Sequence, residues 1–189
     1  MEARARAGGK VEGVDPPALA AAAARRRTGG TVHAGLLEDL QRPQAAYDAI
    51  TFFDALRTVP DPMRFLLAAR RLLRPGGMLV LREVHRKVEM GRERWRALRH
   101  AQVQPSCRAF EYRQVFSPRR LRFALGRAGL TQAWVEPSPI FSEPDAKDSL
   151  AGSLLKRSLG AVSASAYALS RHRLVLGPNL LAFGKAPAA

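Results

Sequence analysis

Residues 47–84 read YDAITFFDALRTVPDPMRFLLAARRLLRPGGMLVLREV, and this stretch decides the fold. It opens with a β-branched and aromatic run at 47–53, which is typical of a strand buried on both faces. The PDP turn at 60–62 begins a helix, because proline in the first helical turn gives up no needed N–H. The PGG at 75–77 indicates the end of that helix, and a second buried strand follows at 78–84. We therefore predict two neighbouring parallel strands joined by a crossover helix.

The composition is that of a globular protein. With 189 residues, 47% hydrophobic and 25% charged, the chain fits one domain with a sizeable core. It has no uncharged apolar run of about 18 residues and no apolar signal core near its first residue, so we expect a cytoplasmic protein without a transmembrane helix. Cys107 is the single cysteine, which excludes an intramolecular disulfide and a cysteine-cluster metal site.

The formal net charge is +15. Such a surplus attracts phosphates, anionic lipid or acidic substrates. Arginine supplies nearly all of it, however, and a chain rich in arginine and alanine but poor in lysine matches the residue usage of high-GC genomes. We therefore favour compositional bias over nucleic-acid binding, which stays open as an alternative.

Strands and helices also alternate outside the central stretch. An Ala-rich helix begins at Pro16-Pro17, and the block FSPRRLRFALGRAGL at 116–130 has a serine N-cap, a proline at the first helical position and a glycine stop. A helix at 92–101 is expected to turn Trp95 and Leu98 inward. Further strands are predicted at 11–15, 31–35, 131–135 and 179–185.

The central stretch resembles the middle of class I S-adenosylmethionine-dependent methyltransferases of the small-molecule kind, types 11 and 12. The resemblance rests on the aspartate after an aromatic residue (Tyr47-Asp48), the PDP turn and the R-x-L-x-P-G-G pattern, all at the family's spacing. The blocks GVDPPALAAAAAR and FSPRRLRFALGRAGL extend it over most of the chain. It implies a Rossmann-like α/β sheet, mostly parallel, with an antiparallel last strand at 179–185.

The resemblance implies S-adenosylmethionine as the cofactor. Asp15 ends the second strand of the family's sheet, where an acid hydrogen-bonds the ribose hydroxyls; an N-cap role before Pro16 is compatible with this. Leu36 takes the place where many relatives carry an aspartate that holds the adenine amino group. The expected adenine contacts are Leu36 and Leu37, and the residues expected to close the cofactor side are Phe52, Phe53 and Asp54.

His85 is the candidate general base, because the ordinary pKa of histidine lies near neutrality. The alternative is a solvated loop histidine in the basic run His85-Arg86-Lys87. Glu83 and Tyr112 are candidate substrate contacts, and we expect no metal site. The acceptor atom, whether O, N or C, cannot be read from the sequence.

We expect one methyltransferase-like domain over 1–189, with its core at 1–139 and 178–186 and a helical insertion at 140–177. The insertion has apolar residues at helical spacing and a basic side. It is interpreted as a packed helical hairpin, with a lid, a homodimer surface or a helix on anionic membrane as the alternatives.

The family's first strand and glycine-rich loop are expected ahead of Gly8-Gly9, and the sequence starts too late to contain them. We therefore expect an N-terminally truncated chain that by itself binds S-adenosylmethionine poorly or not at all. The predicted function is methyl transfer to a small-molecule nucleophile. A catalytically silent binding or scaffold protein and an RNA methyltransferase are the alternatives.

Overall fold

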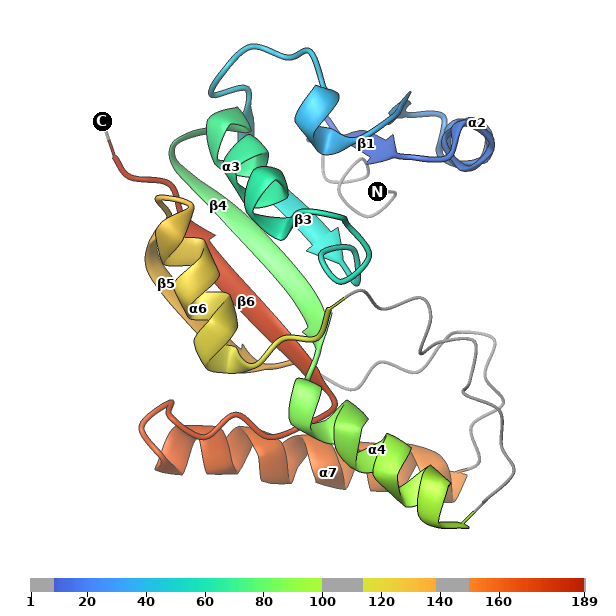
Figure 1. Cartoon of the computed structure of the whole chain (residues 1–189), viewed down its shortest axis with the longest axis vertical. Helices are drawn as coiled ribbons and strands as arrows, with labels where there is room; N and C mark the ends of the chain where they lie inside the picture. The colour runs from blue at the N-terminus through green and yellow to red at the C-terminus, as the bar shows by residue number, and fades with distance from the viewer. Residues whose placement is uncertain (1–8, 100–113, 139–149, 189) are drawn as a thin grey trace. The chain divides into compact units, whose positions relative to one another are not determined.

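The structure is a computed structural model that describes residues 9–99, 114–138 and 150–188 (Figure 1). Its contacts divide the chain into two compact units, one up to Gln44 and one from Ala45 onward. No described helix is long and apolar enough to cross a membrane.

The first unit is a small strand–helix–strand structure. Strands β1 (Glu12–Asp15) and β2 (Thr31–Ala34) are parallel, and helix α2 (Ala18–Thr28) joins them. The helix ends at Gly29, whose φ of 64° is left-handed and whose N–H donates to the carbonyl oxygen of Arg25. A short 3-10 helix, η1 (Leu37–Asp39), follows β2. The predicted strands and helix of this part are confirmed.

The second unit is built on a four-stranded sheet in the order β3-β4-β6-β5. The strands are β3 (Tyr47–Phe53), β4 (Leu73–Val84), β5 (Thr131–Pro137) and β6 (Asn179–Lys185). Strands β3 and β4 are parallel, whereas β6 runs antiparallel to both β4 and β5. The predicted parallel pair and the antiparallel last strand are confirmed.

Helices α3 (Pro62–Leu72) and α6 (Pro118–Arg127) cover the sheet and contact each other. The side chains of Asp61 and Ser117 cap them, because each accepts a hydrogen bond from a backbone N–H of the first turn. Their apolar stripes meet the alternate buried positions of β4. Fully buried leucines from these three elements form the core: Leu66, Leu72, Leu79, Leu81, Leu121 and Leu125.

The PGG at 75–77 does not end α3, so this prediction was wrong. The helix ends at Leu72, and the PGG lies inside β4 as an irregularity between the pairs Tyr47–Leu73 and Ala49–Met78. Gly76 has a left-handed φ of 73°, and its N–H donates to the carbonyl oxygen of Ala186 at 3.1 Å. A residue just after β6 therefore accepts a hydrogen bond from the PGG segment. Local composition does not reveal this long-range contact.

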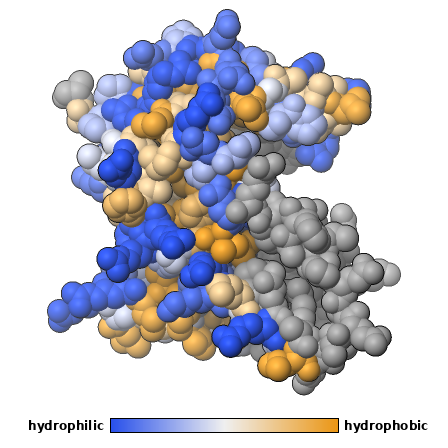
Figure 2. All heavy atoms as spheres, viewed as in Figure 1, coloured by the Kyte–Doolittle hydropathy of each residue, from blue (hydrophilic) through white to orange (hydrophobic). Residues whose placement is uncertain are grey.

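Two further helices, α4 (Arg86–Arg99) and α7 (Leu150–Leu169), complete the described chain. The inward orientation predicted for α4 is wrong, since Trp95 and Leu98 are 54% and 86% exposed. Helix α7 confirms the helical pattern of the insertion. Hydrophobic side chains gather over it along the lower edge of the molecule in Figure 2, and three of its apolar side chains are exposed: Leu159, Val162 and Leu169.

Candidate active site

The carboxyl ends of β3 and β4 lie side by side at one edge of the sheet. Phe53 at the end of β3 is opposite Arg82 near the end of β4, so both strands leave the sheet at the same edge. In open α/β folds, ligands bind outside the carboxyl ends of the strands. The candidates Asp54, Glu83 and His85 all belong to this carboxyl edge.

Asp54 joins the end of β3 to β4. Its backbone is left-handed, with φ of 59°, and its N–H donates to the carbonyl oxygen of Arg82 at 2.8 Å. Its carboxylate is ion-paired with Arg82, and Nη2 of Arg57 lies 3.9 Å from Oδ1. Sequence reasoning missed both arginines; only the three-residue spacing of Asp54 and Arg57 signals the second contact.

Phe52 and Phe53 point to opposite faces of the sheet, as successive strand residues do. The Phe52 ring packs on Phe65 of α3, with ring centroids 4.4 Å apart. Phe53 is 61% exposed, and the guanidinium carbon of Arg82 lies 5.5 Å from its ring centroid. Of the two, Phe53 has the ring that a ligand can reach.

Glu83 is fully buried, although it was a candidate substrate contact. Its Oε1 accepts a hydrogen bond from the N–H of Leu56 at 2.8 Å, which fixes the loop after β3. Its Oε2 has no hydrogen-bond partner among the described residues. Burial raises the pKa of Glu83 to about 7, and the backbone donor at Leu56 offsets part of this effect.

His85 is only 5% exposed, so the interpretation as a solvated loop histidine is wrong. Its Nδ1 lies 3.1 Å from the carbonyl oxygen of Gly177, and its backbone N–H donates to Pro178 at 2.8 Å. Burial lowers the pKa of His85, so the neutral ring is favoured. Because a carbonyl oxygen only accepts, Nδ1 carries the proton and the lone pair of the neutral ring is on Nε2.

Asp15 lies at the carboxyl end of β1, within the first unit. It pairs with Ala34 across the two-stranded sheet, and its carbonyl oxygen accepts from the N–H of Gly35 at 3.1 Å. Helix α2 has Pro17 at its N-cap and no side-chain cap, so the carboxylate of Asp15 does not serve that purpose. It has no ion-pair partner in the described part of the chain. Its carboxylate is therefore available as a hydrogen-bond acceptor.

Leu36 and Leu37 lie in different environments. Leu36 is 38% exposed, whereas Leu37 is 5% exposed and belongs to the core. Of these two side chains, only Leu36 offers exposed apolar surface.

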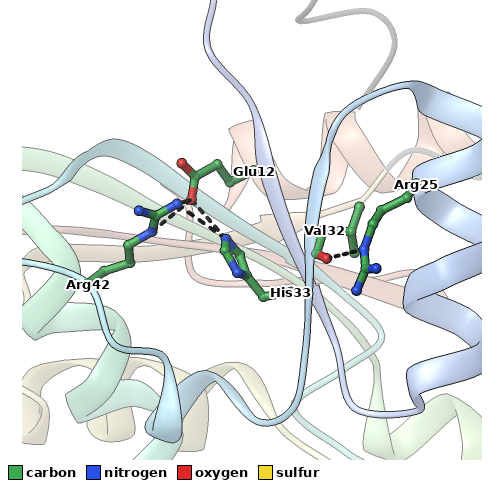
Figure 3. Close-up of polar contacts among 5 residues, drawn as sticks. All are labelled: Glu12, Arg25, Val32, His33 and Arg42. Atoms are coloured by element: carbon green, nitrogen blue, oxygen red, sulfur yellow. Dashed lines mark hydrogen bonds and ion pairs between the residues drawn. The ribbon is translucent and has the colours of Figure 1, made fainter.

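A polar network in the first unit escaped sequence reasoning (Figure 3). Nη2 of Arg42 donates to Oε2 of Glu12 at 2.7 Å, and Nε2 of His33 lies 3.3 Å from the same oxygen. These contacts tie the start of β1 to β2 and to the segment after η1. His33 is thus a strand residue whose ring contacts the carboxylate of Glu12.

The candidate substrate residue Tyr112 lies outside the described residues. Within the described ranges, no group of three or more His, Cys, Asp or Glu side chains could hold a metal ion.

A family model described as a methyltransferase domain matches residues 1–133. An S-adenosylmethionine-dependent methyltransferase from Thermotoga maritima is 22% identical, with a TM-score of 0.61 over 94% of this chain and 73% of that chain. One from Archaeoglobus fulgidus is 13% identical, with a TM-score of 0.60 over 97% of this chain and 79% of that chain. One from Methanosarcina mazei is 16% identical, with a TM-score of 0.57 over 95% and 82%. No curated protein matches the sequence significantly. At these identities, the solved structures establish the fold.

Proposed function

The chain belongs to the class I S-adenosylmethionine-dependent methyltransferase family, and we propose that it transfers a methyl group to an O, N or C nucleophile of a small molecule. The observation that carries the proposal is the carboxyl edge of β3 and β4, where the buried, neutral His85 follows β4. Bound S-adenosylmethionine supplies a methyl group on a sulfonium sulfur, and the sulfur keeps the bonding electron pair when the nucleophile takes the methyl.

Two described residues of the first unit fit the adenosine part of this cofactor. The Asp15 carboxylate is not used for capping and accepts hydrogen bonds from the ribose hydroxyls. Leu36 offers its exposed apolar surface to the adenine ring. We assign no adenine contact to Leu37, because its side chain is buried in the core.

In the second unit, Nε2 of His85 takes the proton from a hydroxyl or amine acceptor as the acceptor's new bond to carbon forms. Phe53 offers an exposed ring at the same carboxyl edge. Asp54 and Glu83 act as positioning residues, since Asp54 is ion-paired to Arg82 and Glu83 holds the N–H of Leu56.

Equilibrium dialysis at cofactor concentrations up to the millimolar range tests the proposal, because it also measures weak binding. Asp15→Ala should weaken cofactor binding by roughly 1.5–3 kcal/mol, the value of a hydrogen bond to a charged group. Asp39→Ala removes an exposed acid of the same unit and serves as the matched control. Equal affinities of the two variants would refute the assignment of Asp15.

A further inference from the structure

Strand β5 lies at the edge of the four-stranded sheet, where β6 is its one neighbour among the described strands (Figure 1). A hollow of about 390 Å³ lies along its residues 133–136. Arg122 of α6, Tyr167 of α7 and His172, which follows α7, also line the hollow. Because none of the carboxyl-edge residues lines it, this β5 hollow is a second place on the same sheet.

Aromatic side chains form much of the hollow. The Trp134 indole stacks on Phe183, with ring centroids 4.5 Å apart and planes 8° from parallel. It nevertheless remains 36% exposed, so part of the indole is open on the hollow side. The rings of Tyr167 and His172 lie 4.7 Å apart. An open indole of this kind offers a large, rigid contact area to another planar ring.

Two opposite charges line the same hollow. Neither Arg122 nor Glu136 has an ion-pair partner in the described part of the chain. Burial raises the pKa of Tyr167, Glu136 raises it further and Arg122 opposes it, so both charges lie near the phenol. The guanidinium of Arg122 can bind an acidic group of a ligand, whereas the carboxylate of Glu136 needs an N–H or ammonium donor.

The backbone around the hollow is strained. Gln132, Arg171 and His172 have left-handed φ values of 49°, 53° and 64°, although none of them is glycine. Gln132 lies in the irregularity of the β5–β6 ladder between Thr131 and Trp134. Strained non-glycine residues cluster at ligand-binding sites, where the surrounding structure holds them in place.

We propose that the β5 hollow binds a small planar aromatic compound that carries an acidic group and an N–H donor. The ring stacks on Trp134, the acidic group meets Arg122, and the donor meets Glu136. Two classes of compound have this chemistry. One is an aromatic ring that carries both an amino group and a carboxylate, and the other is a nucleotide whose base carries an exocyclic amine. The partial exposure of Trp134 and the unpaired opposite charges within one hollow carry the assignment.

The two tryptophans of the chain allow a direct test, because Trp95 lies on α4 and serves as an internal reference. Nitrogen-15 NMR spectra show one indole N–H signal for each tryptophan, and the variants Trp95→Phe and Trp134→Phe assign the two signals. Both signals are followed as the probes are added. The probes are 4-aminobenzoate and cytidine monophosphate, with benzoate and aniline as compounds that lack the donor or the acid. We expect a saturable shift of the Trp134 signal and none of the Trp95 signal. A response to only one of the two probes identifies the source of the ligand chemistry.

Arg122→Ala and Glu136→Gln should each weaken probe binding about tenfold or more, because each removes a charge-assisted contact. Arg119→Ala removes an exposed arginine of the same helix and should leave the affinity unchanged. The spectra also report whether each variant stays folded. The proposal is overturned if neither 4-aminobenzoate nor cytidine monophosphate moves the Trp134 signal, if benzoate or aniline binds as well as the probe that does, or if Arg122→Ala matches Arg119→Ala.

Discussion

Replacing Glu83 with glutamine should remove a pH dependence of stability that burial of this side chain creates. Burial raises the pKa of Glu83 from 4.5 to about 7 in the folded protein. Between these two pH values the unfolded chain loses a proton that the folded chain keeps. The unfolded state therefore binds fewer protons, and the free energy of unfolding falls as the pH rises through this window.

The size of the effect follows from the two pKa values. One pH unit within the window corresponds to about 1.4 kcal/mol. The ionisation of Glu83 therefore costs about 3 kcal/mol of stability between pH 4.5 and 7, and the cost is constant above pH 7. Since the side chain is 0% exposed, solvent does not screen the effect. Glutamine keeps a carbonyl oxygen for the N–H of Leu56 and cannot ionise.

Urea unfolding followed by circular dichroism at several pH values between 4.5 and 8 measures the effect. The stability of Glu83→Gln relative to the unmodified protein should rise by about 3 kcal/mol across this range. Glu136→Gln changes a partly exposed acid of the same sheet and should follow the unmodified protein within about 0.5 kcal/mol. The same pH slope in Glu83→Gln and in the unmodified protein would refute the reasoning.

Three further outcomes are expected. Asp61→Ala removes the acceptor that caps α3 and should lower the free energy of unfolding by about 1 kcal/mol; an unchanged melting temperature would contradict the capping role. Gly77→Ala places a Cβ 2.9 Å from the carbonyl oxygen of Arg74 and should cost at least about 1 kcal/mol. Gly91→Ala meets nothing within 4 Å and is its control; equal stabilities would argue against the close approach. Because burial lowers the pKa of His85, activity toward a hydroxyl acceptor should persist below pH 6.5; an acid limb at or above 6.5 would exclude His85 as the base.

The sequence predicts those parts of the fold that depend on local patterns. The aromatic run of β3, the PDP turn and the alternating residues of β4 specify a strand–helix–strand unit, and the structure contains it. The order of these elements also brings Asp54 and His85 to one edge, because parallel strands end on the same side. Local periodicity and strand direction are sufficient for these conclusions.

The features that could not be predicted depend on contacts between residues far apart in the sequence. The PGG at 75–77 has the composition of a helix stop, yet its place within β4 depends on a contact with Ala186. The periodicity of α4 indicates an apolar face but not what covers it, and Trp95 is exposed. Similarly, a glutamate at the end of a strand suggests a contact with a ligand. In the structure Glu83 is instead buried and accepts a hydrogen bond from the N–H of Leu56.

Burial at the carboxyl edge favours uncharged forms of both an acid and a base. It raises the pKa of Glu83 and lowers the pKa of His85, so near neutral pH the base is free to take a proton. Water at this edge would return both pKa values towards their ordinary ranges, ionise Glu83 and protonate His85 near pH 6.5. A protonated His85 has no free lone pair on Nε2 and could not take a proton from the acceptor. Under the proposed role of His85, the burial of these two side chains therefore serves the reaction as well as the packing.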